Sequence, residues 1–412
     1  MKAFITGMGA VTGIGSHVDE IWSNIAQGQH GLRRLEKLDL THFRTQIGAE
    51  LPFDPVELGA SLLPDLKIKS LIPSTQMVLL ATQMALQDAK LETALIDKHR
   101  RGGVIGSGLG GIIFAEHGMK KIMSTHPYYK SQGIHPLTVP FVDPNFSTSI
   151  ISRTWDMLGP QYTVSNACSS STHALGQALM LIQAGKADVV IAGGTEASIQ
   201  PMTFAGFDQM RAMSVENDHP ERGCRPFSAG RGGFVMGDAA GVLIIESERH
   251  MTDRGAEPVA QLCGYGASGG GYHMVKPKPD ASDVIASMNN ALADAGMDAS
   301  GIDALNAHGT GTELNDISEL NAIAEVFKDK SEPLLLMANK ANFGHTLGAA
   351  GAIEAIVSIK AMQTGTLPPF INFEADDKLD YSKVHFPTDQ AESHRINSVI
   401  SDSFGFGNNN AS

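Results

Sequence analysis

The sequence predicts an α/β protein made of two similar halves around largely buried sheets. Short apolar runs bounded by glycine alternate with longer helical patterns, and this alternation is typical of α/β folds. Runs this apolar indicate strands that are covered on both faces. In the first half we expect strands at residues 2–6, 103–106, 162–165, 188–192 and 240–246, and helices that include residues 75–89 and 171–183.

The two halves share one plan. The first contains a strand, YTVS, then a loop, NACSS, then a small-residue helix, STHALGQALMLI. The second contains LLLMA, then NKANFGHT, then LGAAGAIEAIVSI. Similarity of plan indicates an internal duplication, and two facing copies would bring both loops to one central site. The best boundary lies near residues 254–258, which divides the chain into halves 1–255 and 256–412.

Composition excludes several classes of protein. The chain has 412 residues with 31 basic and 44 acidic side chains, and its net charge of −13 argues against nucleic acid as the main partner. Hydrophobic residues make up 42% of the chain, enough for a large core. Three cysteines cannot build a disulfide framework, so we expect a reducing, cytoplasmic setting. No apolar run approaches the ~20 residues that span a membrane, and the glycine-broken N-terminus does not resemble a signal peptide.

Three motifs look chemical but are better explained by structure. GSGLGG at residues 106–111 fits G-x-G-x-x-G, but the acidic residue that a dinucleotide site needs ~20 positions later is missing. GASGG around Ser268 fits an esterase motif, but two prolines follow it where a helix should begin. The fifteen histidines show no His-x-x-x-His pair with a glutamate, which argues against a zinc site.

Cys168 is the first candidate for chemistry. In VSNACSSSTHALGQAL a strand ends, small residues turn, and a helix begins at the cysteine. The positive end of a helix favours a thiolate, and small neighbours leave room for a bulky acyl group. These residues alone also leave open the alternative that Cys168 is a buried, chemically inert cysteine. However, His308, Lys340 and His345 also lie in glycine-rich turns, and such a set is hard to explain as packing.

These segments resemble the elongating β-ketoacyl-acyl-carrier-protein synthases, the ketosynthases of the thiolase superfamily. The resemblance covers nearly the whole chain. In order, it includes KAFITGMGAVTGIG, VSNACSSS, AGGTEASIQP, RPFSAGRGGFVMGDAAG, NAHGTGTELND, NKANFGHTLGAAGAIEAI and SFGFG. It implies a thiolase-like fold of two pseudo-repeated halves in five layers, α-β-α-β-α. The first half would carry the nucleophilic cysteine and the second half both catalytic histidines.

The resemblance also implies the chemistry. Cys168 would accept the acyl chain as a thioester, with His308 and His345 completing a Cys-His-His triad. Lys340 and Glu354 would form the supporting charge pair. A malonyl thioester that loses carbon dioxide leaves an enolate, and two imidazole N–H donors would stabilise its oxygen. The carbanion would then attack the acyl thioester in a decarboxylative Claisen condensation, which makes the protein an acyltransferase of fatty-acid or polyketide-type biosynthesis.

Further residues match positions that contact the substrate in the family. Phe406 matches the mobile gating phenylalanine, and its backbone N–H, with that of Cys168, would hold the second oxyanion. Thr310 and Thr312 match threonines of the pantetheine tunnel. Leu109 matches a residue on the floor of the acyl pocket.

The implied partner is an acyl carrier protein that bears acyl or malonyl groups on phosphopantetheine. Carrier proteins are acidic and this chain carries −13, so docking requires a local basic patch. Lys67, Lys69 and Arg211 lie in segments that match the docking surface. The family is dimeric, which suggests a homodimer or a heterodimer with a second ketosynthase-like chain. No cofactor and no metal is implied.

Two other functions are alternatives to elongation. Thiolases use a Cys-His-Cys set, and no cysteine follows Cys263, which argues against them. A non-elongating partner subunit of a ketosynthase heterodimer remains an alternative, although such subunits usually lack the nucleophile that Cys168 would supply.

The chain departs from the family at several positions. Gly232 replaces the aspartate of R-D-G-F, and Asn408 replaces a glycine beside the gate. Val275 and Lys276 stand where hydroxyl or small residues usually line the tunnel mouth. The chain also stops at Ser412, short of the usual last strand. We expect these differences to affect substrate choice more than chemistry.

Overall fold

The first half is built on a six-stranded mixed sheet. A computed structural model describes residues 1–128 and 130–412. The strand order is β5-β4-β6-β7-β1-β8; β4 pairs in parallel with β5 and β6, and the other pairs are antiparallel. The strands are β1 Ala3–Val11, β4 Arg101–Gly106, β5 Gln161–Val164, β6 Val189–Glu196, β7 Ala239–Ser247 and β8 Ala260–Leu262. All five strands predicted for this half are confirmed.

The first strand is longer than the sequence predicted. It continues from Thr6 to Val11, through glycines that were expected to break it. A Cβ atom on Gly9 would lie 2.0 Å from the carbonyl oxygen of Ala81, so this glycine lets a helix lie directly on the strand. The predicted helix at residues 75–89 is α3, Pro73–Asp88. It begins two residues earlier because proline suits the first turn of a helix.

The second half contains a smaller parallel sheet. Its order is β13-β11-β10-β15, and all three pairs are parallel. A three-stranded sheet, β16-β17-β9, lies beside it. These strands are β9 Ala267–Gly269, β10 Ala304–Asn306, β11 Leu334–Met337, β13 Val384–His385, β15 Val399–Ser401, β16 Ser403–Gly405 and β17 Asn409–Ala411. Ser268 lies within β9 and not at a strand-to-helix turn, and its hydroxyl donates to the carbonyl oxygen of Asp283 at 2.5 Å.

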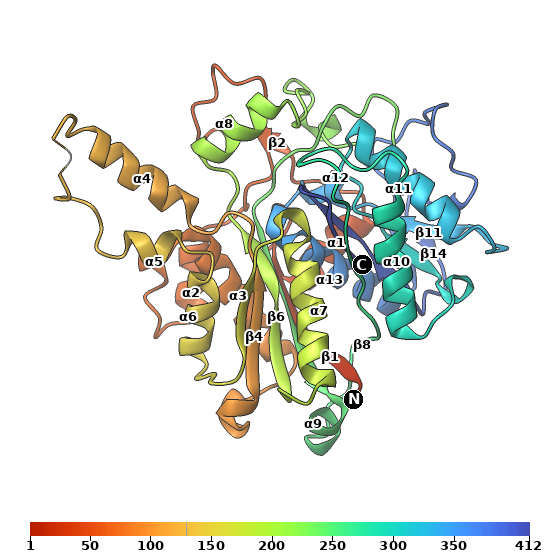
Figure 1. The fold of residues 1–412 in the computed structure, drawn as a ribbon, viewed down its shortest axis with the longest axis horizontal. Helices are drawn as coiled ribbons and strands as arrows, with labels where there is room; N and C mark the ends of the chain where they lie inside the picture. The colour runs from red at the N-terminus through yellow and green to blue at the C-terminus, as the bar shows by residue number, and fades with distance from the viewer. Residues whose placement is uncertain (129) are drawn as a thin grey trace.

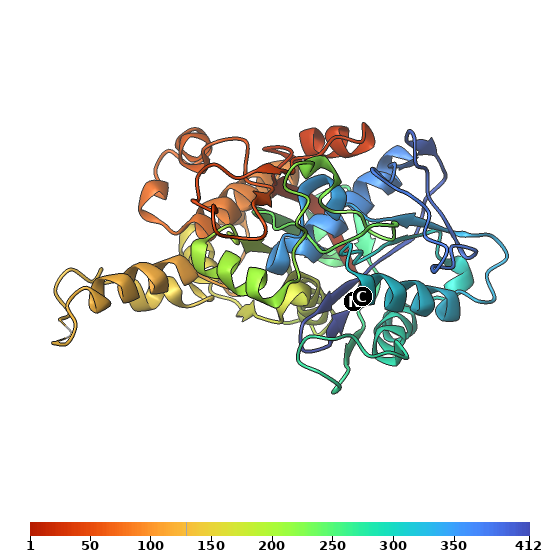
Figure 2. The same cartoon turned by 90° about the horizontal axis from the view of Figure 1, so that it is seen from above.

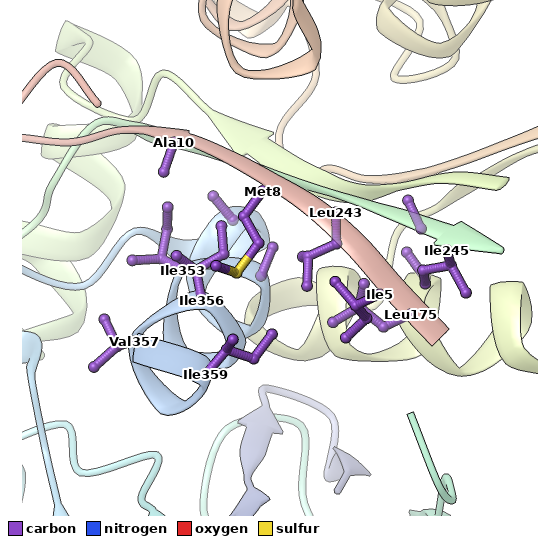
Figure 3. Close-up of a cluster of buried hydrophobic side chains, with 14 of the residues drawn as sticks. Ile5, Met8, Ala10, Leu175, Leu243, Ile245, Ile353, Ile356, Val357 and Ile359 are labelled. Carbon is purple, nitrogen blue, oxygen red and sulfur yellow. The ribbon is translucent and has the colours of Figure 1, made fainter. Parts of the chain in front are cut away.

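Two central helices separate the sheets. They are α7, Ser170–Gln183, and α13, Ala350–Thr364. Buried isoleucines of α13 pack against β1, β7 and α7, as Figure 3 shows for Ile353, Ile356 and Ile359. The backbone carbonyl of Glu354, on α13, accepts a hydrogen bond of 2.9 Å from Asn306 of the second sheet. A helix that is apolar on most sides must be buried, and these contacts bury it between the sheets.

Outer helices complete five layers, α-β-α-β-α, which confirms the predicted fold class (Figures 1 and 2). Helix α3 covers the far face of the larger sheet, and α10, Ser282–Ala295, and α11, Glu313–Val326, cover the smaller one. The arm formed by α4 and α5 projects from the body. The remaining helices are α1 Val18–Ala26, α2 Pro55–Leu62, α4 Ile112–Met123, α5 Thr138–Val142, α6 Phe146–Thr154, α8 Pro201–Met210, α9 Glu248–Asp253 and α12 Lys340–Phe343.

The boundary between the halves is crossed by one strand. Helix α9 ends at Asp253, and the chain then returns to pair β8 with β1 of the larger sheet. The division at residues 255 and 256 therefore stays a prediction. Among the described residues, no helix combines the length and apolar character needed to cross a bilayer.

Candidate active site

One cavity of about 380 Å³ brings the two predicted reactive loops together. Seven of the predicted site residues line it: Arg211, Cys168, His308, Thr310, Thr312, His345 and Phe406. Cys168 comes from the first half and both histidines from the second. The duplicated plan of strand, loop and helix therefore delivers one loop from each half to a common site, as expected.

Cys168 lies in a tight turn at the start of α7. A short 3-10 turn, Ala167–Ser169, connects β5 to the helix, and Ala167 has a left-handed φ of 51°. The backbone N–H of Asn166 donates to Ser170 Oγ at 2.8 Å, which fixes the turn. Only 6% of Cys168 is exposed. The helix therefore presents the sulfur at its N-terminal end, inside the protein.

The expected thiolate is wrong for this state of the site. Burial raises the pKa of Cys168 to about 12, which outweighs the opposing charge of Lys340. The cysteine is therefore a neutral thiol at neutral pH. Hydrogen bonding from the backbone N–H of Phe406 opposes this rise in the pKa of the thiol.

His308 is held through its backbone by Glu319 and through its ring by Lys340. Its backbone N–H and that of Gly309 donate to the two oxygens of Glu319 at 2.6 and 2.8 Å. The Lys340 ammonium binds the carbonyl oxygen of His308 and lies 3.4 Å from Nδ1. An ammonium group can only donate, so Nδ1 accepts and the ring proton is on Nε2.

His345 reaches the same tautomer by another route. The backbone N–H of Leu347 donates to His345 Nδ1 at 3.3 Å, which again leaves the proton on Nε2. Its ring lies 5.3 Å from that of His308, at 81°. Burial, reinforced by the charge of Lys340, lowers the pKa of both histidines well below the usual value. The site therefore contains two neutral imidazoles, each with one N–H donor left for the cavity.

Lys340 and Glu354 form a fully buried ion pair. Lys340 begins α12, Glu354 lies in the first turns of α13, and their side chains are 1% and 0% exposed. Burial raises the pKa of Glu354, while Lys340 opposes this shift. Because Lys340 also contacts His308, the pair connects the central helix to the histidines.

Lys340→Met is expected to destabilise the protein by about 3–5 kcal/mol at pH 8, because it leaves Glu354 buried without a cation. A carboxyl group with a raised pKa in the folded state gains protons on folding, so the variant should recover stability as the pH falls from 8 to 5. Urea unfolding at the two pH values measures this. The control is Lys360→Met on α13, the helix that carries Glu354; its partner Asp19 is 81% exposed, so this change should cost about 0–1 kcal/mol. Equal effects of the two variants would contradict the assignment.

The Phe406 turn is tied to the loop before α10. A Cβ atom on Gly405 would lie 2.7 Å from the carbonyl oxygen of Asn166, so only glycine fits beside the cysteine turn. Asn408 has a left-handed φ of 56°, and its Nδ2 donates to the carbonyl oxygen of His273 at 2.8 Å. The Phe406 ring lies 6.2 Å from that of Phe207. Asn408 therefore holds one side of the turn through its amide.

The other predicted residues are distributed unevenly. Thr310 and Thr312 lie side by side in the cavity wall, and their hydroxyl groups hydrogen-bond to each other at 2.8 Å. Leu109 packs against the apolar cluster that contains Cys168, but it is not among the described residues that line the cavity. Lys67 and Lys69 are exposed at the 3-10 turn between α2 and α3, away from the cavity lining, and Arg211 alone of the docking set reaches it.

Two glutamates were missed by the sequence analysis. Glu196 ends β6 and accepts backbone hydrogen bonds from Gly108, Leu109 and Gly348 at 2.7, 3.1 and 3.1 Å. The N–H groups of the GSGLGG turn are thus used by the protein itself, which confirms that the turn is structural. Burial raises the pKa of Glu196 to about 7 and that of Glu319 to about 8. For Glu196 the sequence did offer a signal: an acidic residue at the end of an apolar strand is buried, and a buried carboxylate needs hydrogen-bond donors.

The departures from the family gather at the cavity. Gly232, Val275, Lys276 and Asn408 all line it. They surround the same space as Cys168 and the histidines, so they are placed where substrate would enter.

The layered fold and the cysteine-histidine cavity define a thiolase-like enzyme. The chain belongs to the β-ketoacyl synthase family: residues 2–250 match the N-terminal domain of beta-ketoacyl synthases and residues 259–374 match their C-terminal domain. It is accordingly an acyltransferase-type enzyme.

Relatives support this assignment over the full length. A 3-oxoacyl-[acyl-carrier-protein] synthase 2 of Coxiella burnetii is 36% identical over 411 residues, covering 99% of this chain and 97% of that protein. The chloroplastic 3-oxoacyl-[acyl-carrier-protein] synthase I of Arabidopsis thaliana is 34% identical, covering 100% of this chain and 85% of that protein.

Solved structures agree with the sequence relatives. A beta-ketoacyl synthase from Burkholderia phymatum superposes with a TM-score of 0.91 at 31% identity, covering 100% of this chain and 98% of that one. A type II polyketide ketosynthase, AntDE, solved with its acyl carrier protein AntF, gives 0.89 at 27% identity and covers 100% and 97%.

Proposed function

We propose that the protein is an elongating β-ketoacyl-acyl-carrier-protein synthase. It would condense an acyl chain, held on Cys168, with a malonyl thioester. The observation that carries this proposal is the common cavity of Cys168, His308 and His345, in which both imidazoles keep an Nε2–H donor. The test is a single-turnover reaction with acyl- and malonyl-carrier protein, in which mass spectrometry should detect the β-ketoacyl product.

The first step transfers the acyl group. The sulfur of Cys168 attacks the thioester carbonyl, the carbon–sulfur bond to the carrier breaks, and the thiol proton leaves with the carrier sulfur. The backbone N–H of Phe406 hydrogen-bonds the Cys168 sulfur, and together with the N–H of Cys168 it would donate to the oxyanion formed in this step.

The second step makes the nucleophile. The carbon–carbon bond of the malonyl group breaks, carbon dioxide leaves, and the electron pair forms an enolate. Nε2–H groups of His308 and His345 would donate to the enolate oxygen, and the nearby Lys340 charge favours the anion. The enolate carbon then attacks the acyl carbonyl, the bond to Cys168 breaks, and the released thiolate takes up a proton from solvent.

An acyl carrier protein is the proposed partner, as it is for the AntDE ketosynthase. Its pantetheine arm would pass Thr310 and Thr312, which line the cavity, and its acidic surface would meet Arg211 at the rim. Lys67 and Lys69 lie farther from the cavity than Arg211, and we propose that they form a second, more distant basic part of the docking surface. We propose a dimer that works in the cytoplasm.

A non-elongating subunit is the second candidate. Solved relatives include the ishigamide ketosynthase/chain length factor, at a TM-score of 0.88 and 27% identity. The presence of Cys168 and both histidines in one cavity favours elongation. A protein that folds normally but never carries an acyl group on Cys168 would instead support the partner role.

Asn408→Gly is expected to change the balance between acylation and condensation while the fold stays intact. Glycine accepts the left-handed conformation, but the variant loses the hydrogen bond from the side-chain amide of Asn408 to the carbonyl oxygen of His273. Loss of one hydrogen bond of about 0.5–1.5 kcal/mol should shift the open-to-closed ratio of the Phe406 turn by about 2–10-fold. Acyl-Cys168 formation and condensation are measured separately. The matched control is Asn372→Gly, because Asn372 is also left-handed and its amide donates to the carbonyl oxygen of Glu221, outside the cavity lining.

Phe406→Ala in the same assays should keep acylation and impair condensation, because the ring would no longer order the two steps. If both rates stay at the wild-type level in Phe406→Ala, the ring only packs and does not gate.

A further inference from the structure

We propose that His385, Glu392 and His394 form a binding site for one divalent transition-metal ion of the zinc type. The three side chains lie in the second half, and none of them is among the described residues that line the catalytic cavity. The site is independent of the proposed condensation.

The ligand atoms already converge on one point. Glu392 Oε2 lies 2.7 Å from His385 Nε2 and 2.9 Å from His394 Nε2. Nitrogen and oxygen atoms of all three side chains lie within 4.8 Å of one another. Ligands bound at about 2.0–2.1 Å to a tetrahedral ion are about 3.3 Å apart, so only small side-chain shifts are needed.

The backbone of each ligand is fixed by a different partner. His385 lies in β13 and pairs with Leu335 of β11. Glu392 begins β14, Glu392–Ser393, and pairs with β12, Thr366–Leu367. The backbone N–H of His394 donates to the carbonyl oxygen of Gly365 at 2.9 Å. Glu392 and His394 are two residues apart in extended chain, so their side chains share one face.

The donor set selects the class of ion. Two imidazoles and one carboxylate suit zinc, cobalt, nickel or copper, whereas magnesium and calcium prefer oxygen ligands alone. When an ion binds, each neutral imidazole moves its proton from Nε2 to Nδ1 and offers Nε2 as ligand.

The surroundings leave room for water as a fourth ligand. The side chains of His385, Glu392 and His394 are 43%, 40% and 29% exposed, so an ion can reach them from solvent. The His-x-x-x-His motif, whose absence argued against a zinc site, places its two histidines on one helix. Here the spacing is His-x6-Glu-x-His across two strands, and only the fold reveals the cluster.

The test is titration of the tag-free, metal-stripped protein with Zn²⁺ by calorimetry and with Co²⁺ by visible spectroscopy. We expect one ion per chain and a cobalt spectrum without the charge-transfer band of a thiolate, which excludes the three cysteines. His385→Ala, His394→Ala and Glu392→Gln should each weaken binding at least about tenfold. The matched control is His99→Ala, an exposed histidine outside the cluster.

Glu392→Gln also guards against misfolding, since it preserves shape and a hydrogen-bond acceptor; its melting temperature without metal should equal that of the control. The proposal is overturned if no saturable binding occurs in the millimolar range. It is equally overturned if binding survives in His385→Ala/His394→Ala, because the ion would then lie elsewhere.

Discussion

Cys168→Ala is expected to abolish acyl transfer and condensation completely, because no other described residue in the cavity offers a thiol to carry the acyl chain. Decarboxylation of the malonyl group should persist, since both imidazole donors and Lys340 remain in place. Alanine fits where the small cysteine side chain was, so the fold should be retained. Acylation, carbon dioxide release and condensation are measured separately on the same preparation.

Cys263→Ala is the matched control for this variant. Cys263 is an exposed cysteine in the second half and outside the catalytic cavity, so all three rates should stay unchanged. Normal condensation by Cys168→Ala would show that Cys168 is not the nucleophile.

His308→Ala and His345→Ala are each expected to slow malonyl decarboxylation by about 10²–10³-fold, the usual effect of losing one oxyanion donor. Each variant removes one of the two Nε2–H groups that face the cavity. Acylation of Cys168 should be affected less, because the backbone N–H of Phe406 and the start of α7 remain. The maximal rate should therefore fall more than the apparent affinity for malonyl-carrier protein.

His219→Ala, on an exposed 3-10 turn outside the cavity, controls for the general loss of a histidine. A variant of His308 or His345 that decarboxylates at the wild-type rate would exclude that residue from the oxyanion site. Unequal losses would identify the histidine that makes the stronger hydrogen bond.

Periodicity predicted most of the fold because buried strands and helices leave strong patterns. The alanine- and isoleucine-rich segment LGAAGAIEAIVSI and the glycine-bounded strand at residues 103–106 were sufficient to identify α13 and β4. The predicted end of β1 was wrong, because a glycine in a strand allows a helix to pack closely against it as readily as it allows a turn. Which face of β1 a helix covers depends on tertiary packing and not on local sequence.

The reactive side chains of the candidate site and the Lys340–Glu354 pair were predicted, but the two glutamates that hold its loops were not. Glu196 binds backbone N–H groups from distant segments, and Glu319 binds those of the loop before its own helix; both sets of hydrogen bonds form only when the chain is folded. The protonation state of Cys168 also depends on burial, which a helix N-terminus alone does not reveal. The tautomers of both histidines follow from contacts with Lys340 and Leu347 that no spacing rule contains.

The most direct test of the account is mass spectrometry of the Cys168 peptide after incubation with a panel of acyl-carrier proteins. The account predicts an acyl adduct on Cys168, with the mass of one acyl group, that disappears when malonyl-carrier protein is added and β-ketoacyl product forms. An unmodified Cys168 with every donor, or an acyl group on another residue, would contradict it.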